Sequence, residues 1–244
     1  MAARKRPEET PVYLFLGFLE SGKTKFIQET LEDKRFNTGE KTLLLVCEEG
    51  EEEYDPARFA CKGVEIVYIE DEADLTQERL TALQREKGIE RVLVEYNGMW
   101  LMNTFFEAMP EGWMLNQIMM FVQTGTFLDY NRNMRQFVFD KVQYAEMVVF
   151  SRLDPAKTDK TELHKIVRAI SRRADIVYED INGKAEFDDT VDPLPFDVNA
   201  PVVNIEDRDY ALFYRDISEN MQPYDGKTRL ARTYAPNTAW GRYF

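Results

Sequence analysis

Short apolar runs alternate with amphipathic stretches from residue 12 to about residue 180. Several runs are continuously apolar, which is typical of strands buried on both faces of a parallel sheet. Between them, apolar residues recur at helical spacing, as at Leu163, Ile166, Val167 and Ile170. This alternation predicts an α/β fold with a doubly wound, mostly parallel sheet. The expected strands are Val12–Phe18, Thr42–Glu48, Glu65–Glu70, Arg91–Asn97, Gln117–Gln123, Glu146–Leu153 and Asp175–Glu179.

The pattern changes after Asp180, where Asn182-Gly183 predicts a tight turn. The stretch 188–201 is rich in Asp and Pro, which indicates a linker between a main α/β domain over 1–187 and a short β-rich segment over 202–244. A segment of about 40 residues is small for a core of its own. It either docks on the main domain or begins a second domain that this chain does not complete.

Charge narrows the range of partners. The chain carries 44 acidic and 31 basic residues, a net charge of −13, so it repels phosphate backbones and we expect no nucleic-acid binding. A phosphate pocket built from backbone N–H groups is compatible with this charge.

No apolar run has the length of a signal peptide or a membrane span. Cys47 and Cys61 are too few for a disulfide scaffold or a thiolate zinc site. We therefore expect a cytoplasmic protein without direct membrane insertion.

Gly17-Phe-Leu-Glu-Ser-Gly-Lys-Thr24 is a complete phosphate-binding loop, placed between an apolar strand and a helical pattern. In such a loop the backbone N–H groups wrap the phosphates, Lys23 reaches the β- and γ-phosphate oxygens, and the Thr24 hydroxyl binds Mg²⁺. The sequence thus predicts a P-loop NTPase fold. The expected nucleotide-binding residues of the loop are Gly17, Glu20, Ser21, Gly22, Lys23, Thr24 and Lys25.

Three further segments follow predicted strands and carry acids. The acidic segment from Cys47 to Asp55 could hold Mg²⁺ or orient water, although much of it is equally consistent with an acidic loop exposed to solvent. Glu95 and Gly98 place a carboxylate and a free N–H after the fourth strand, which fits a metal and γ-phosphate site or an ordinary turn. Asp154 suits the two adjacent N–H donors of guanine, and with the proline after it also suits a helix start.

Taken in order, these four segments resemble the CobW/HypB/UreG-like GTPases, which are associated with metal-centre and cobalamin assembly and with metal homeostasis. The family motifs Gly-Phe-Leu-Gly-Ala-Gly-Lys-Thr, Asn-Glu-Phe-Gly-x4-Asp, Glu-Thr-x-Gly and Asn-Lys-x-Asp correspond to segments beginning at Gly17, Cys47, Glu95 and Ser151. The resemblance covers roughly residues 11–180. The residues of the segments that begin at Cys47 and Glu95 are most similar to those of a subgroup from anaerobic Firmicutes. Members of that subgroup accompany a predicted permease and carry a small C-terminal β domain.

The resemblance implies a slow, Mg²⁺-dependent switch that binds GTP or GDP and hydrolyses GTP. Its implied partners are a metalloprotein client or a permease subunit, and a homodimer is compatible with it. Lys23, Glu48, Glu95 and Gly98 would be the catalytic residues, with Glu48 positioning water. Thr24 with Asp55 or Glu95 would hold Mg²⁺, and Ser151, Arg152 and Asp154 would contact the base.

Four positions depart from the family. The Cys-x-Cys-Cys metal site is replaced by Ile69–Leu75, whose acids suit either a hard cation or a solvated helix start. Ser151 and Arg152 stand in place of Asn and Lys, and the fifth strand ends before Thr126 without the usual Asp. Glu20 adds a negative charge inside the phosphate loop. The acids of the first departure are Glu70, Asp71, Glu72 and Asp74.

Other residues suggest structural roles. His164 lies off the apolar stripe of its helix, so we expect it to be exposed. Cys47 is expected to be a small buried residue, and Trp100, Trp113 and Met114–Met120 to pack in the core rather than form a partner surface. Two other functions stay open, an ATP-dependent small-molecule kinase on the same fold and a non-hydrolysing nucleotide-binding docking module.

Overall fold

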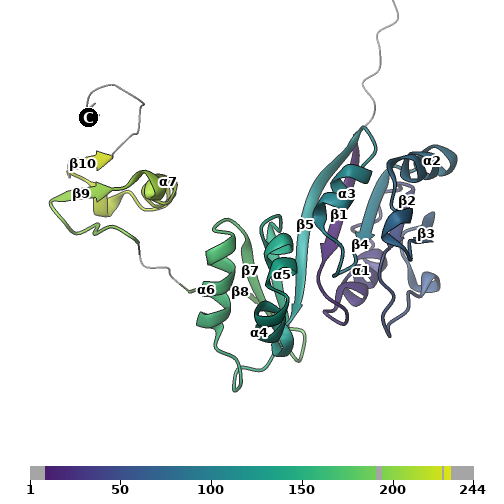
Figure 1. The fold of residues 1–244 in the computed structure, drawn as a ribbon, viewed down its shortest axis with the longest axis horizontal. Helices are drawn as coiled ribbons and strands as arrows, with labels where there is room; N and C mark the ends of the chain where they lie inside the picture. The colour runs from purple at the N-terminus through teal and green to yellow at the C-terminus, as the bar shows by residue number, and fades with distance from the viewer. Residues whose placement is uncertain (1–8, 191–193, 227, 232–244) are drawn as a thin grey trace, which may run out of the picture. The chain divides into compact units, whose positions relative to one another are not determined.

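The chain divides into two compact units in the computed structural model, Met1–Asp189 and Thr190–Phe244 (Figure 1). The structure describes residues 9–190, 194–226 and 228–231. The first unit has two apolar clusters and the second unit has one. The end of the expected C-terminal segment, residues 232–244, lies outside the described residues.

An eight-stranded sheet forms the centre of the first unit, in the order β3-β2-β4-β1-β5-β6-β7-β8. Every neighbouring pair up to β7 is parallel, and only β8 runs antiparallel, beside β7. All seven strands expected from the sequence are present, which confirms the mostly parallel α/β fold. Their bounds are β1 (Thr10–Leu16), β2 (Thr42–Val46), β3 (Val64–Tyr68), β4 (Arg91–Glu95), β5 (Trp113–Gln123), β6 (Met147–Leu153), β7 (Asp175–Asp180) and β8 (Ala185–Phe187).

Helices cover both faces of this sheet. Successive strand residues point to opposite faces, and both faces carry apolar side chains that need cover. In β1, Leu14 belongs to one apolar cluster, whereas Phe15 belongs to the other with Ile27 and Leu31 of α1. This two-sided burial explains the continuously apolar strands in the sequence. The helices are α1 (Lys23–Glu32), η1 (Pro56–Arg58), η2 (Glu72–Asp74), α2 (Gln77–Lys87), α3 (Met102–Ala108), α4 (Thr124–Asn133), α5 (Arg135–Val142) and α6 (Lys160–Ile170).

The strand order reverses at β1, which lies between β4 and β5. In an open α/β sheet, ligands bind beyond the carboxyl ends of the strands at such a point. The register brings these ends together, since Glu95 of β4 pairs with both Phe15 of β1 and Val46 of β2. Gln123 of β5 likewise pairs with Ser151 of β6. The loops after β1, β2, β4 and β6 therefore lie at one edge.

The second unit holds a two-stranded parallel sheet of β9 (Val202–Ile205) and β10 (Thr228–Ala231). Between the strands lie η3 (Asp207–Asp209), α7 (Tyr210–Glu219) and η4 (Gln222–Tyr224). The sequence pattern indicated an extended run here but no helix. Phe213 of α7 packs with Val203, Ile205, Phe196 and Tyr224, so this helix is stabilised by contacts from outside its own sequence window.

His164 is buried, so the prediction that it is exposed was wrong. Its Nδ1 lies 2.5 Å from Oδ2 of Asp188, just beyond β8. The helical stripe of α6 could not reveal this cover, because it comes from a distant segment. Trp100 and Trp113 are buried in the core as expected, although Met114 is half exposed. Among the residues that the structure describes, no helix combines the length and apolar character needed to cross a bilayer.

Candidate functional site

The phosphate loop between β1 and α1 has the backbone of a tight cradle. Gly17 and Gly22 have φ angles of 140° and 98°, a region that favours glycine. A Cβ atom on Gly17 would lie 2.2 Å from the backbone oxygen of Phe121, so no larger residue fits there. Glu20 has a φ of 59°, and a non-glycine residue in this left-handed region carries strain of about 1–2 kcal/mol. This conformation explains the glycine that the family has at this position.

Lys23 is the buried cation of the site. Its Nζ donates to the backbone oxygens of Gly17 and Phe18 at 2.9 and 3.0 Å. It also donates to Oε2 of Glu48 at 2.6 Å, and this ion pair is almost completely buried. Burial strengthens such a pair, because little water screens the charges. The loop thus holds its lysine between its own carbonyls and a carboxylate from the end of β2.

Thr24 lies at the start of α1, where its Oγ1 donates to Oε1 of Glu95 at 2.8 Å. The other oxygen of Glu95 accepts a hydrogen bond from the hydroxyl of Tyr54. Burial raises the pKa of Glu95, while the hydrogen bond from Tyr54 and the charge of Lys23 act in the opposite direction. Burial and the charge of Glu95 also raise the pKa of Tyr54, which keeps this hydroxyl a donor. A hydroxyl beside a buried carboxylate is a set of oxygen ligands that suits Mg²⁺.

Glu48 and Gly98 join the loops after β2 and β4. The backbone N–H of Gly98 donates to Oε1 of Glu48 at 3.2 Å, so the two oxygens of Glu48 contact Gly98 and Lys23 respectively. A Cβ atom on Gly98 would lie 2.8 Å from Cα of Phe18 and 2.9 Å from the oxygen of Gly17. Glycine is therefore required where this loop crosses the phosphate loop.

The loop after β6 contacts the phosphate loop through Ser151. Its Oγ donates to the backbone oxygen of Ser21 at 3.0 Å, and its own carbonyl accepts from Thr124 Oγ1 at 2.6 Å. Arg152 has a φ of 54° and lines the same cavity as the phosphate loop. Asp154 is half-buried and pairs with Lys157 at 3.1 Å, and the hydrogen bonds from Lys157 and the backbone of Ala156 lower its pKa.

These groups surround a cavity of about 130 Å³ at the carboxyl edge of the sheet. Five predicted phosphate-loop residues, Glu20 to Thr24, meet here with Glu48, Glu95 and Arg152. The other predicted site residues lie outside the lining, namely Gly17, Lys25, Asp55, Gly98, Ser151 and Asp154. The lining residues are Leu19, Glu20, Ser21, Gly22, Lys23, Thr24, Glu48, Gly50, Glu51, Glu52, Glu95 and Arg152.

Asp55 and Lys25 are not brought to this cavity. The Asp55 carboxylate accepts from the N–H of Ala57 and caps η1, and Asp55 does not line the cavity that Thr24 lines. Lys25 is exposed and lies 3.9 Å from Glu29 on the surface of α1. Tyr54, the residue before Asp55, contacts Glu95 instead. The sequence reasoning missed this tyrosine, although an aromatic residue within a run of carboxylates was the available signal.

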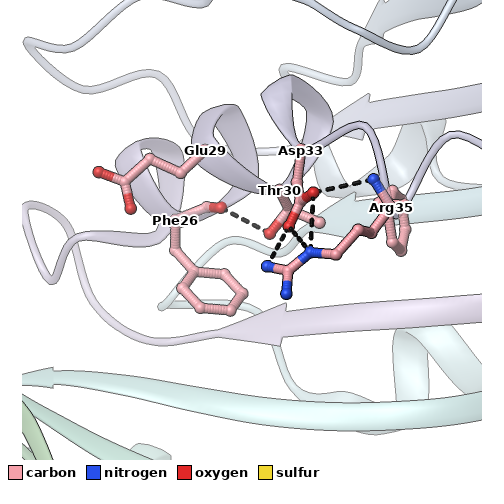
Figure 2. A pocket seen from close by; sticks show the side chains of 6 residues that line it. Phe26, Glu29, Thr30, Asp33 and Arg35 are labelled. Carbon is pink, nitrogen blue, oxygen red and sulfur yellow. Dashed lines mark hydrogen bonds and ion pairs between the residues drawn. The ribbon is translucent and has the colours of Figure 1, made fainter.

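A larger, more open depression of about 540 Å³ lies along α1 (Figure 2). Its polar groups bind one another, since Arg35 holds Asp33 at 2.7 Å and Thr30 donates to the oxygen of Phe26 at 2.8 Å. None of the residues that line it belongs to the phosphate loop. We therefore place the chemistry in the smaller cavity, where a buried lysine and two carboxylates converge.

The acidic segment after β3 does not form a metal site in the described structure. Asp71 accepts from the N–H of Ala73 and caps η2, and Glu72 accepts from the hydroxyl of Thr104. Within residues 9–190, 194–226 and 228–231, no three His, Cys, Asp or Glu side chains come together in a way that could hold a metal ion. Asp71 thus acts as a local helix cap, and Glu72 as a contact to α3.

The site fits a nucleotide with Mg²⁺. α1 begins without a side-chain cap, so its first N–H groups face the loop with the positive end of the helix. Ser21 Oγ is the single buried side-chain oxygen or nitrogen in the described part of the chain without a hydrogen-bond partner. A buried cation, unpaired donors and a hydroxyl–carboxylate pair match phosphate oxygens and a hard metal ion.

Comparisons with known proteins agree with this geometry. The chain resembles the Zn(II)-bound YjiA GTPase of E. coli with a TM-score of 0.50 and 21% identity, over 69% of this chain and 57% of that one. It also resembles the hydrogenase maturation factor HypB of Archaeoglobus fulgidus with a TM-score of 0.50 and 16% identity, over 71% and 83% of the two chains. At these identities the likeness shows a shared fold, and no curated protein sequence matches the chain.

The family model "CobW/HypB/UreG, nucleotide-binding domain" matches residues 11–178. The match spans the phosphate loop, the loops after β2 and β4, and the segment that carries Ser151. Because it covers more than half of the chain, the chain belongs to the CobW/HypB/UreG family, and residues 11–178 are its nucleotide-binding domain.

Proposed function

We propose that the protein is a Mg²⁺-dependent switch that binds GTP and hydrolyses it slowly. The observation that carries this proposal is the convergence of Lys23 and Thr24 with Glu48, Glu95 and Gly98 at the ends of three adjacent strands. Ligand-dependent ordering of the loops after β2 and β4 is the kind of change that a partner can detect. Family membership and the two GTPase-like folds support the same reading.

In this proposal the phosphate-loop N–H groups and Lys23 bind the phosphates, and Thr24 with Glu95 holds Mg²⁺. Bound Mg²⁺ neutralises charge that develops on the phosphate oxygens. Tyr54 orients Glu95 through its hydroxyl. Asp55 caps η1 in the structure, so Glu95 is the better candidate of the two acids predicted from the sequence. The water-positioning role of Glu48 stays a prediction.

Asp154 is proposed to read guanine, with Arg152 beside the base. The carboxylate of Asp154 is held at the end of β6 by Ala156 and Lys157. A guanine would have to compete with Lys157 for this carboxylate, and the pair is exposed enough for the exchange to cost little. Ser151 supports the phosphate loop through its hydrogen bond to the backbone oxygen of Ser21.

A titration calorimetry experiment with GDP, a non-hydrolysable GTP analogue and ADP tests the proposal. We expect the guanine nucleotides to bind more tightly than ADP, and Lys23→Ala to weaken all three. Asp154→Asn should reduce the guanine preference, while Asp129→Asn, an exposed acid on α4, should not. Equal binding of GDP and ADP by the unmodified protein would contradict the base assignment and favour the kinase alternative.

Hydrolysis needs its own measurement. We expect slow phosphate release without a partner, because the sequence offers no evident arginine finger. Nucleotide recovered from gently purified protein should be GDP by mass spectrometry. Bound GTP that persists without phosphate release over hours would instead favour a non-hydrolysing docking module.

The cellular role belongs to the same proposal. We infer a cytoplasmic protein that acts in metal homeostasis or metal-centre assembly, with a metalloprotein client or a permease subunit as partner. The thiolates of the family's Cys-x-Cys-Cys site are replaced by residues 69–75, so metal transfer through that segment is not part of the proposal. Pull-down of the full chain loaded with GDP or with the GTP analogue, followed by mass spectrometry, would identify a state-dependent client.

A further inference from the structure

Glu48 makes two contacts that an anion in the phosphate cavity would also make. Its Oε2 lies 2.6 Å from Nζ of Lys23, and its Oε1 lies 3.2 Å from the backbone nitrogen of Gly98. One carboxylate thus bridges a buried ammonium group and a backbone N–H from different loops. A phosphate group with two unesterified oxygens presents the same pair of acceptors.

The two donors are those that meet the terminal phosphate in phosphate-binding loops. The lysine of such a loop reaches the β- and γ-phosphate oxygens. A free N–H from the loop after the metal-binding strand binds the γ-phosphate in switch proteins, where γ-phosphate contacts order the switch segments. Glu95 at the end of β4 marks that strand here, and Gly98 follows it.

The ion pair between Glu48 and Lys23 is strong enough to oppose an incoming phosphate. The side chains of Lys23 and Glu48 are 3% and 11% exposed, so the pair is little screened by water. Removing one partner of such a pair leaves a buried charge without compensation, which costs far more than breaking a surface pair. An incoming phosphate must therefore replace the carboxylate rather than share the site with it, because both are negatively charged.

We propose that Glu48 determines which nucleotide the site accepts, because its carboxylate occupies the place of the terminal phosphate of a triphosphate. This inference rests on the proposed function. A diphosphate leaves the Lys23–Glu48–Gly98 bridge in place, whereas a triphosphate displaces Glu48 and moves the loop after β2. Glu51 and Glu52 on that loop also line the cavity, so the displacement changes the surface that surrounds the nucleotide.

The test compares Glu48→Gln with Glu49→Gln, which removes the same charge from an exposed neighbour. Calorimetric titrations use GDP and guanosine 5′-(β,γ-imido)triphosphate with Mg²⁺. We expect Glu48→Gln to shift the ratio of the two dissociation constants toward the triphosphate by about tenfold or more, and Glu49→Gln to leave it within about threefold. An unchanged ratio, or a shift toward GDP, would overturn the inference.

The unmodified protein offers a second measurement that needs no variant. In hydrogen exchange followed by mass spectrometry, a peptide that spans residues 48–52 should change its exchange when the imidotriphosphate binds and keep it when GDP binds, because only the triphosphate displaces Glu48. Equal exchange with both nucleotides contradicts the inference. If Glu48→Gln does not fold, Glu48→Asp replaces it, since the shorter side chain cannot span both donors.

Failure of the proposed function has a different signature. If neither guanine nucleotide binds the unmodified protein, the GTP-binding proposal is wrong. If both nucleotides bind tightly and Glu48→Gln leaves the ratio of their dissociation constants unchanged, the GTP-binding proposal stands and only the role of Glu48 is rejected. Thermal unfolding without nucleotide adds a check, because Glu48→Gln should lower the unfolding temperature by breaking the buried pair. No loss of stability would show that the bridge is not formed.

Discussion

The hydroxyl of Thr24 donates a 2.8 Å hydrogen bond to Glu95, which ties the first turn of α1 to the end of β4. Both groups are ligands of the type that Mg²⁺ prefers. Tyr54 holds the second oxygen of Glu95, so the carboxylate has a fixed orientation before any metal arrives. A site arranged in advance loses less entropy when it binds its ligand.

Glu95→Gln should therefore remove most of the Mg²⁺ dependence of nucleotide binding. We expect affinity in Mg²⁺ to fall by about ten- to a hundredfold, a range that metal-site substitutions commonly produce, and affinity in EDTA to change little. Titrations with and without the metal measure this. Tyr54→Phe keeps the carboxylate and should cause a smaller loss in Mg²⁺. A large loss for Glu95→Gln in EDTA would mean that Glu95 supports the fold rather than the metal.

Glu20 provides a test of charge and strain within the phosphate loop. Glu20→Gln removes a negative charge from the cavity lining and should increase the affinity for GDP and for a triphosphate alike. Glu20→Gly removes the charge and also relieves the left-handed backbone at a φ of 59°. Its stability should stay within about 1 kcal/mol of the unmodified protein, because glycine also gains entropy in the unfolded chain. Urea unfolding measures stability, and weaker binding by both variants would contradict the prediction.

Ser151 and Asp154 should separate loop support from base recognition. Ser151→Ala deletes the hydrogen bond to the carbonyl of Ser21. We expect it to weaken GDP and ADP binding by a similar factor, because the phosphate loop is common to both ligands. Asp154→Asn should weaken GDP binding alone. A change in guanine preference for Ser151→Ala would instead place Ser151 in the base pocket, as its position in the motif predicted.

Lys141 gives the protein a measurable pH dependence. Its side chain is fully buried on α5, with Nζ 2.9 Å from the oxygen of Trp100 and 3.8 Å from Asp140. Burial lowers the pKa of Lys141 to about 8. The negative charges of Asp140 and Glu48 raise this pKa, and the positive charge of Lys23 lowers it further. Between this value and the ordinary pKa near 10.5, the unfolded chain binds more protons than the folded one. The free energy of unfolding that Lys141 contributes therefore rises with pH in this window.

The variant Lys141→Met should lack this rise. The difference in unfolding free energy between the unmodified protein and Lys141→Met should grow by about 2 kcal/mol between pH 7.5 and pH 9.5. Urea unfolding at several pH values measures it, and Lys165→Met, an exposed lysine of α6, is the matched control. A constant difference across this range would show that Lys141 titrates at its ordinary value.

Much of the fold could be predicted because its signals are local or periodic. Seven strands were found from apolar runs, since a strand buried on both faces needs apolar residues at every position. α7 was missed, because the contacts of Phe213 that stabilise it come from β9 and η4. His164 was misjudged for the same reason, since Asp188 covers it from beyond β8.

The sequence by itself determined the phosphate loop, because strand, loop and helix are contiguous and the glycines Gly17 and Gly22 follow from local backbone geometry. Only the tertiary structure decided which acids reach it. Glu48 and Glu95 contact Lys23 and Thr24 because β4 lies between β2 and β1 and all three strands end in register, whereas Asp55 caps η1. Such proximity depends on strand order and loop path, which no single segment encodes.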